Sequence, residues 1–136
     1  MTNTVNTPNT QNSQYTKEAY ISKAGQYMGK QLIHPVEGIA PFDGLYVKML
    51  TVSEMSDFAA RCDEFNENNE DRLAGIREKA LMIVDSTGKP MFDPDDREDV
   101  KFLRDLPGQV LMGVRDAFLS INSEDGLKKL QPAKNS

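Results

Sequence analysis

The sequence predicts a small, mainly α-helical domain: an antiparallel helix pair plus further helices, preceded by a short N-terminal strand or hairpin. The chain has 136 residues, an ordinary length for one domain. Apolar residues recur at three- and four-residue steps in its second half, as they do on the buried face of a helix. Proline, glycine and aspartate separate these segments, which is typical of turns and helix starts.

The composition and charge exclude several classes of protein. The formal net charge is −5 and the pI is about 4.9, which opposes nonspecific binding to nucleic acid or to an anionic membrane. The one cysteine, Cys62, cannot form an intrachain disulfide, and this indicates a reducing compartment. No apolar segment approaches the roughly 20 residues of a membrane span, and the N-terminus lacks the features of a signal peptide. We therefore expect the protein in the cytoplasm of the cell that makes it.

The first 43 residues carry weaker signals. Residues 1–15 are mostly Thr, Asn, Gln and Ser, which bury too little apolar surface to offset the entropy of ordering, so we expect a disordered head. Residues 16–43 predict a weak helix followed by a linker that contains proline. Thr16 is the expected N-cap, and the apolar residues at helical spacing are Tyr20, Ala24, Tyr27 and Met28.

A short strand is expected at the start of the compact domain, which we place at residues 44–125. Leu45–Leu50 is apolar, contains Tyr and Val, and follows Gly44, a pattern typical of a strand. This segment could pair with Val36–Ile39 as a hairpin around Pro41–Gly44.

The antiparallel helix pair follows. Thr51 and Glu54 match a capping box, so a helix over Ser53–Asn66 is predicted. The expected apolar stripe of this helix is Met55, Phe58, Ala59, Cys62 and Phe65. A polar turn precedes a second helix, whose apolar face is expected to hold Leu73, Ile76, Ala80, Ile83 and Val84. Because the connection is short, the two helices should pack antiparallel.

Two more helices are predicted after a turn at Asp85–Gly88. Asp93 and Pro94 read as N-cap and first residue of a third helix, in which Val100 and either Phe102 or Leu103 face inward. A break at Leu106–Gly108 then precedes a fourth helix with a buried stripe of Val110, Leu111, Val114, Ala117, Phe118 and Ile121. We expect that helix to end at Asn122–Gly126 and residues 126–136 to form a frayed tail.

The residues do not predict a catalytic, cofactor-binding or metal site. The acidic segment that starts at Asp93 resembles a calcium loop only superficially, since Glu98 stands where a glycine is needed and Arg104 where a bidentate glutamate is needed. His34, the only histidine, is expected in a loop and is too isolated to form a zinc site with Cys62. Cys62 itself fits the role of a small buried apolar residue.

Several short motifs occur in an order that resembles the tail assembly chaperones of long-tailed, siphovirus-like bacteriophages and their prophages. The resemblance covers about Gly44 to Asp125. The motifs are T-x-x-E-x-x-x-F (Thr51, Glu54, Phe58), V-D-x-x-G-K-P-x-F (Val84, Asp85, Gly88, Lys89, Pro90, Phe92), an acidic helix start (Asp93, Asp95, Asp96) and I-N (Ile121, Asn122).

The resemblance implies a function in phage tail assembly. Such chaperones bind the long apolar helices of the tape measure protein, keep them soluble, and help to recruit tail tube protein. The resemblance also implies action in the host cytoplasm, absence from the mature virion, possible homo-oligomers and possibly a longer frameshifted form. It implies no enzymatic activity, no cofactor, and no nucleic acid or membrane partner.

The partner-binding surface is expected on the last strong helix, at Met112 and Leu119, because these apolar residues lie off its main stripe. A wider core face or a self-association surface would explain the same residues. The methionines fit either core packing or an adaptable binding surface. Two other functions remain open: a small acidic bacterial adaptor or regulatory module that binds proteins, and an enzyme whose site is not recognised.

Overall fold

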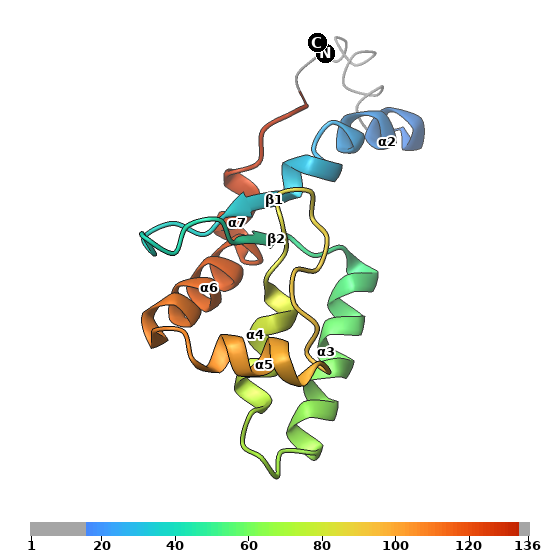
Figure 1. Ribbon diagram of the computed structural model, residues 1–136. Helices are drawn as coiled ribbons and strands as arrows, with labels where there is room; N and C mark the ends of the chain where they lie inside the picture. Colours follow the sequence, from blue (N-terminus) through green and yellow to red (C-terminus); the bar gives the residue numbers. More distant parts are fainter. Residues whose placement is uncertain (1–15, 134–136) are drawn as a thin grey trace, which may run out of the picture.

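The fold is mainly α-helical with a small two-stranded hairpin, which confirms the predicted fold class (Figure 1). The computed structural model describes residues 16–133, so the predicted disordered head at residues 1–15 and the last three residues lie outside the described part. The elements in order are α2 (Lys17–Gly25), the 3₁₀ helix η1 (Gly29–Leu32), β1 (Ile33–Pro35), β2 (Tyr46–Lys48), α3 (Val52–Glu67), α4 (Ala74–Met82), α5 (Arg97–Arg104), α6 (Gly108–Ile121) and α7 (Glu124–Lys128).

The predicted helix pair is present as α3 and α4, which pack side by side (Figure 1). The face that α3 buries differs from the predicted stripe. Phe65 is buried and Phe58 is half-buried, whereas Met55 and Ala59 are exposed. Phe58 and Phe65 are seven residues apart and therefore lie above one another on the helix. Because α3 packs mainly against α4, only this narrow stripe is covered.

Helix α4 is shorter than predicted and ends at Met82. Ile83 and Val84, which we expected on its apolar face, continue as extended chain. The Val84 N–H donates to the Tyr46 carbonyl at 2.8 Å, and the Tyr46 N–H donates back at 3.1 Å. Ile83 and Val84 are both buried, and β-branched side chains suit a buried extended segment better than the last turn of a helix.

The hairpin forms with a different first strand from the one predicted. β1 pairs antiparallel with β2, and His34 lies opposite Val47. Val36–Ile39 is therefore not the strand but the start of the loop after it. Its two apolar side chains are buried against α6, where Gly113 leaves room: a Cβ on Gly113 would lie 2.7 Å from Ile39 Cγ2.

The turn between α4 and α5 forms as predicted. Asp85 Oδ1 accepts hydrogen bonds from the N–H groups of Thr87 at 2.8 Å and Lys89 at 3.1 Å. Gly88 has φ of +91°, a conformation that glycine adopts without strain. This short-range chemistry reverses the chain in the middle of the V-D-x-x-G-K-P-x-F motif.

Helix α5 begins three residues later than predicted. The Asp93 side chain accepts from the Asp95 N–H at 2.8 Å and closes a separate turn. Asp96, not Asp93, is the N-cap, and its carboxylate accepts from the Asp99 N–H at 3.0 Å. Consecutive aspartates offer several capping oxygens, and the sequence pattern could not decide between them.

The core lies between α6, α4 and the hairpin. The predicted stripe of α6 is confirmed, with its most buried members at Val110, Val114, Phe118 and Ile121. The Phe118 ring lies 5.0 Å from the Phe58 ring, which joins α6 to α3. On α5 the buried residues are Val100 and Leu103, as predicted, while Phe102 is exposed.

The segment expected to be a frayed tail begins with the short helix α7. Gly126 is buried, and a Cβ there would collide with the carbonyl of Ile121, so α7 packs directly on the end of α6. The chain then runs toward α2, where the Ala133 N–H donates to the Gln26 carbonyl at 2.6 Å. This hydrogen bond links the C-terminal segment to the N-terminal helix.

Candidate functional site

An apolar groove of about 930 Å³ separates α2 from the rest of the domain. Tyr20, Ala24 and Tyr27 of α2 and the turn after it form one wall, and Met49 and Leu50, between β2 and α3, line the groove from the side of the body. The other lining residues are Lys23, Met28, Leu32, Thr51, Val52, Ser53, Leu127 and Leu130.

Exposed apolar side chains gather around this groove. Val52 is 87 % exposed, Tyr20 is 64 % exposed and Leu127 is 63 % exposed. Single exposed apolar residues are normal, but an apolar patch that continues into a groove is typical of an interaction site. The groove is therefore the best candidate for a functional surface in this domain.

The Asn122 side chain fixes the part of the body that lines the groove. Its Oδ1 accepts from the Leu50 N–H at 2.8 Å, and its Nδ2 donates to the carbonyls of Lys48 at 3.1 Å and Phe118 at 3.0 Å. One side chain thus ties the end of α6 to the segment between β2 and α3. This gives the asparagine of the I-N motif a structural role that the sequence alone did not suggest.

The rim of the groove is fixed at the start of α3. The predicted capping box is confirmed: the Thr51 hydroxyl accepts from the Glu54 N–H, and the Glu54 carboxylate accepts from the Thr51 N–H at 2.9 Å. Lys48 Nζ lies 2.6 Å from Glu54 Oε2, and this hydrogen bond is the main reason why the pKa of Glu54 is lowered. Val52 is the first residue of α3, so the capping contacts hold it at the rim.

The α2 wall is built differently, because α2 buries none of its residues. Its predicted N-cap is confirmed, with the Thr16 hydroxyl accepting from the Ala19 N–H at 3.1 Å. Its other end is held by the hydrogen bond from Ala133 to Gln26 and by Gln31 Nε2, which donates to the Met28 carbonyl at 2.9 Å. The wall is therefore anchored at its C-terminal end and apolar along the side that lines the groove.

The two residues predicted to bind a partner, Met112 and Leu119, lie elsewhere. They are 59 % and 49 % exposed, and their seven-residue spacing places them on one face of α6. Neither side chain lines the groove, so Met112 and Leu119 do not contribute to the apolar surface of the groove. Sequence reasoning missed Leu127 and Leu130, whose three-residue spacing is the only sequence signal that would have marked them.

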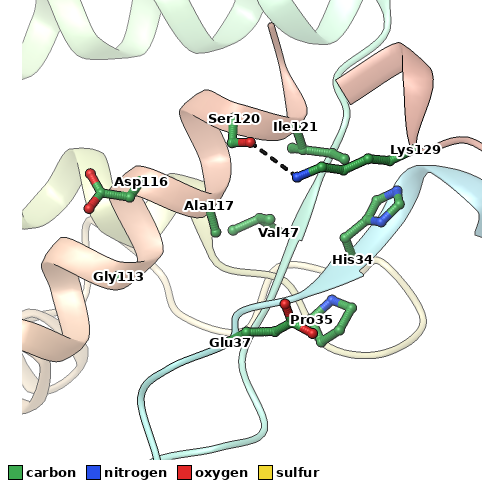
Figure 2. A pocket seen from close by; sticks show the side chains of 10 residues that line it. All are labelled: His34, Pro35, Glu37, Val47, Gly113, Asp116, Ala117, Ser120, Ile121 and Lys129. Carbon is green, nitrogen blue, oxygen red and sulfur yellow. Dashed lines mark hydrogen bonds between the residues drawn. The ribbon is translucent and has the colours of Figure 1, made fainter. Parts of the chain in front are cut away.

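A second pocket, of about 560 Å³, has a mixed polar and apolar lining (Figure 2). It is lined by Glu37 and Asp116, and by Lys129, whose Nζ lies 3.3 Å from Ser120 Oγ. His34 also lines it, but its Nε2 is buried and has no hydrogen-bond partner within residues 16–133. No hydrogen bond in this part of the chain joins His34 to Ser120, so the pocket does not hold a paired nucleophile and base.

The chemistry of Cys62 and of the acidic residues does not add a reactive site. Burial, helped by the nearby carboxylates of Glu78 and Asp63, raises the pKa of the Cys62 thiol to about 11, which disfavours the reactive thiolate. Among the described residues, no group of three or more His, Cys, Asp or Glu side chains is placed to hold a metal ion.

None of the described helices has both the length and the apolar content needed to cross a membrane.

Comparison with protein families, with curated proteins and with solved structures gave no match to this chain.

Proposed function

We propose that this protein is a tail assembly chaperone of a long-tailed bacteriophage, which binds apolar helical segments of the tape measure protein and keeps them soluble. Two independent observations support the proposal. The motifs between Gly44 and Asp125 resemble those of such chaperones. The stronger observation is the apolar groove beside α2, a concave apolar surface of the kind that an amphipathic helix covers.

The size of the groove fits a short stretch of helix. A helix with its side chains is about 10 Å wide and rises 1.5 Å per residue. Two turns of helix are about 11 Å long, and a groove of about 930 Å³ has room for the apolar side chains of such a segment. Two turns present three or four apolar residues on one face, which matches the helix-in-groove mode of recognition.

The character of the lining favours apolar burial over charge pairing. Lys23 is the one charged residue among the thirteen that line the groove, and most of the others are apolar. Binding through this surface should therefore persist at moderate salt, whereas pairing between exposed charges is screened within about 8 Å at physiological ionic strength. In this proposal the protein acts in the host cytoplasm, before the tail is complete.

Co-expression with the tape measure gene of the same phage or prophage tests the proposal. The soluble fraction of the tape measure protein and its recovery with this chain by affinity pull-down are the two measurements. Tyr20→Glu and Leu127→Glu place a charge in the groove and should reduce both. Met112→Glu and Leu119→Glu make the same chemical change at exposed sites outside the groove and serve as matched controls.

The outcomes separate the alternatives. If the tape measure protein is equally soluble with and without this chain and no complex is recovered, the chaperone function is rejected and an adaptor for another partner becomes the better explanation. If only Met112→Glu and Leu119→Glu abolish the complex, the chaperone function stands but the binding surface is the α6 face.

A further inference from the structure

The pocket of about 560 Å³ beside β1 holds charged groups of both signs that do not pair with each other. Glu37 comes two residues after β1 and Lys129 caps the end of α7, so distant segments of the chain bring the two side chains to one pocket. Lys129 Nζ lies 3.3 Å from Ser120 Oγ. Within residues 16–133, neither Lys129 nor Glu37 makes an ion pair. Both charges can therefore interact with a ligand.

The two charges lie on opposite sides of an apolar wall. Figure 2 shows the Glu37 carboxylate and the Lys129 ammonium group on either side of the Val47 side chain. Val47 and Ala117 both line the pocket, so the surface between the charges is apolar. Asp116 lines the pocket as well, but in Figure 2 its carboxylate points away from both charged groups. The pocket thus presents one carboxylate and one ammonium group, separated by apolar side chains.

The rest of the lining supplies contact surface. Pro35 and Ile121 are apolar, and the Nε2 atom of His34 is buried, so this atom does not reach a ligand in the pocket. A volume of about 560 Å³ lies within the range of roughly 300–1,000 Å³ that is typical of small-molecule sites. Such sites combine apolar walls with a few polar groups that orient the ligand. The size and the lining therefore fit a small molecule.

We propose that this pocket binds a small zwitterion, a molecule with one free ammonium group and one free carboxylate, such as an amino acid or a short peptide. Lys129, with the Ser120 hydroxyl beside it, binds the carboxylate of the ligand. Glu37 binds the ammonium group. The apolar part of the ligand lies over Val47, between its two charges.

The arrangement of charge favours a zwitterion over a simple anion or cation. An anion beside Lys129 would also be repelled by the Glu37 carboxylate, and a cation beside Glu37 would be repelled by the Lys129 ammonium group. A zwitterion places each of its charges next to the opposite one. Because Glu37 and Lys129 are both exposed, each charge pair contributes modestly, and we expect a dissociation constant on the order of 1 mM.

NMR titration of the ¹⁵N-labelled full chain with alanine and with alanyl-alanine tests this inference without any tape measure protein. At least one of the two ligands should shift the amide signals of Val47 and Gly113, which line the pocket. Comparison of the two lengths distinguishes an amino acid from a short peptide. The N-acetylated and the C-amidated forms of the ligand that binds each lack one charge, and both should bind at least about fivefold more weakly.

Variants of the chain test the same two contacts. Glu37→Gln and Lys129→Met each remove one charge from the pocket and should weaken binding about fivefold. Asp116→Asn is a matched control, because the Asp116 carboxylate points away from the proposed ligand. Lys128→Met is the second control, because Lys128 does not line the pocket and its Nζ lies 3.7 Å from Asp125 Oδ1. Both controls should bind as the wild type does, and circular dichroism verifies that every variant is folded.

Three results would overturn the inference. The first is the absence of any shift with either ligand at concentrations about tenfold above the expected dissociation constant. The second is binding of the N-acetylated and C-amidated forms as tightly as the free ligand. The third is a loss of affinity in Glu37→Gln and Lys129→Met no larger than in the controls. A loss confined to Lys129→Met would identify a site for anions and would likewise reject a zwitterion.

Discussion

Replacing Asn122 with alanine should destabilise the domain more than replacing an asparagine at an exposed site. The Asn122 side chain makes three hydrogen bonds to backbone groups, and two of them reach Lys48, the last residue of β2, and Leu50, which precedes α3. Asn122→Ala removes the acceptor for the Leu50 N–H and the donor for the Lys48 carbonyl. The Leu50 N–H lies beyond the end of β2, so the ladder of the hairpin does not replace the hydrogen bond that it loses.

The expected loss follows from these two backbone groups. Leaving a buried polar group without a partner costs about 1–3 kcal/mol. Asn122 is only partly buried, so water can reach part of the site, and the total loss should be about 2–4 kcal/mol. For a domain of this size that corresponds to a fall in Tm of about 10 °C.

Urea unfolding followed by circular dichroism measures this loss directly. Asn68→Ala is the matched control, because the Asn68 side chain also donates to a backbone carbonyl, that of Glu64, but at an exposed site. The control should lose less than about 1 kcal/mol. The reasoning is refuted if Asn122→Ala loses no more free energy of unfolding than Asn68→Ala, or if its m-value changes so much that the two-state assumption fails.

Three further predictions concern the core, the rim of the groove and the cysteine. Phe118→Ala should lower the free energy of unfolding by about 3–5 kcal/mol, and Phe58→Ala, at a half-buried site, should cost the lower end of that range. A loss under about 1 kcal/mol for both variants in urea unfolding would contradict the packing of the two rings. The hydrogen bond from Lys48 is the main reason why the pKa of Glu54 is lowered from 4.5, so the contribution of this carboxylate to stability is present above pH 4.5 and is lost as the pH falls through the lowered value. Glu54→Gln should make the urea midpoint less sensitive to acid in that range. A pH profile that Glu54→Gln leaves unchanged would contradict this expectation. The Cys62 thiol, with its pKa raised to about 11, should react with iodoacetamide much more slowly in the folded protein than in urea at mildly alkaline pH; equal rates would show that the thiol is freely accessible and ordinarily acidic.

Local sequence signals predicted the elements of this fold well where a single helix cap or turn decides the conformation. The capping box at Thr51, the Asp85–Gly88 turn and the Thr16 cap are all present, because each depends on residues within four positions of one another. The choice among several aspartates at the start of α5 was wrong by three residues, since the sequence offered more than one equivalent cap.

Faces and strands were harder to predict, because they depend on what packs against them. Met55 and Ala59 belong to an apolar pattern on α3, yet they are exposed, since α3 is covered along a narrow stripe. Ile83 and Val84 fit the period of α4, but Val84 pairs with Tyr46 of the hairpin, and the chain is extended there rather than helical. In both cases a tertiary contact overrode the periodicity.

The groove itself could be predicted only on its α2 side. The spacing of Tyr20, Ala24 and Tyr27 marked an apolar helix face, but the sequence did not show that this face lines the same groove as Leu127 and Leu130, about 100 residues later in the chain. The contact between the C-terminal segment and α2 depends on Gly126, because this residue lets α7 pack on the end of α6 and the chain then runs back toward α2. No local pattern contains this information.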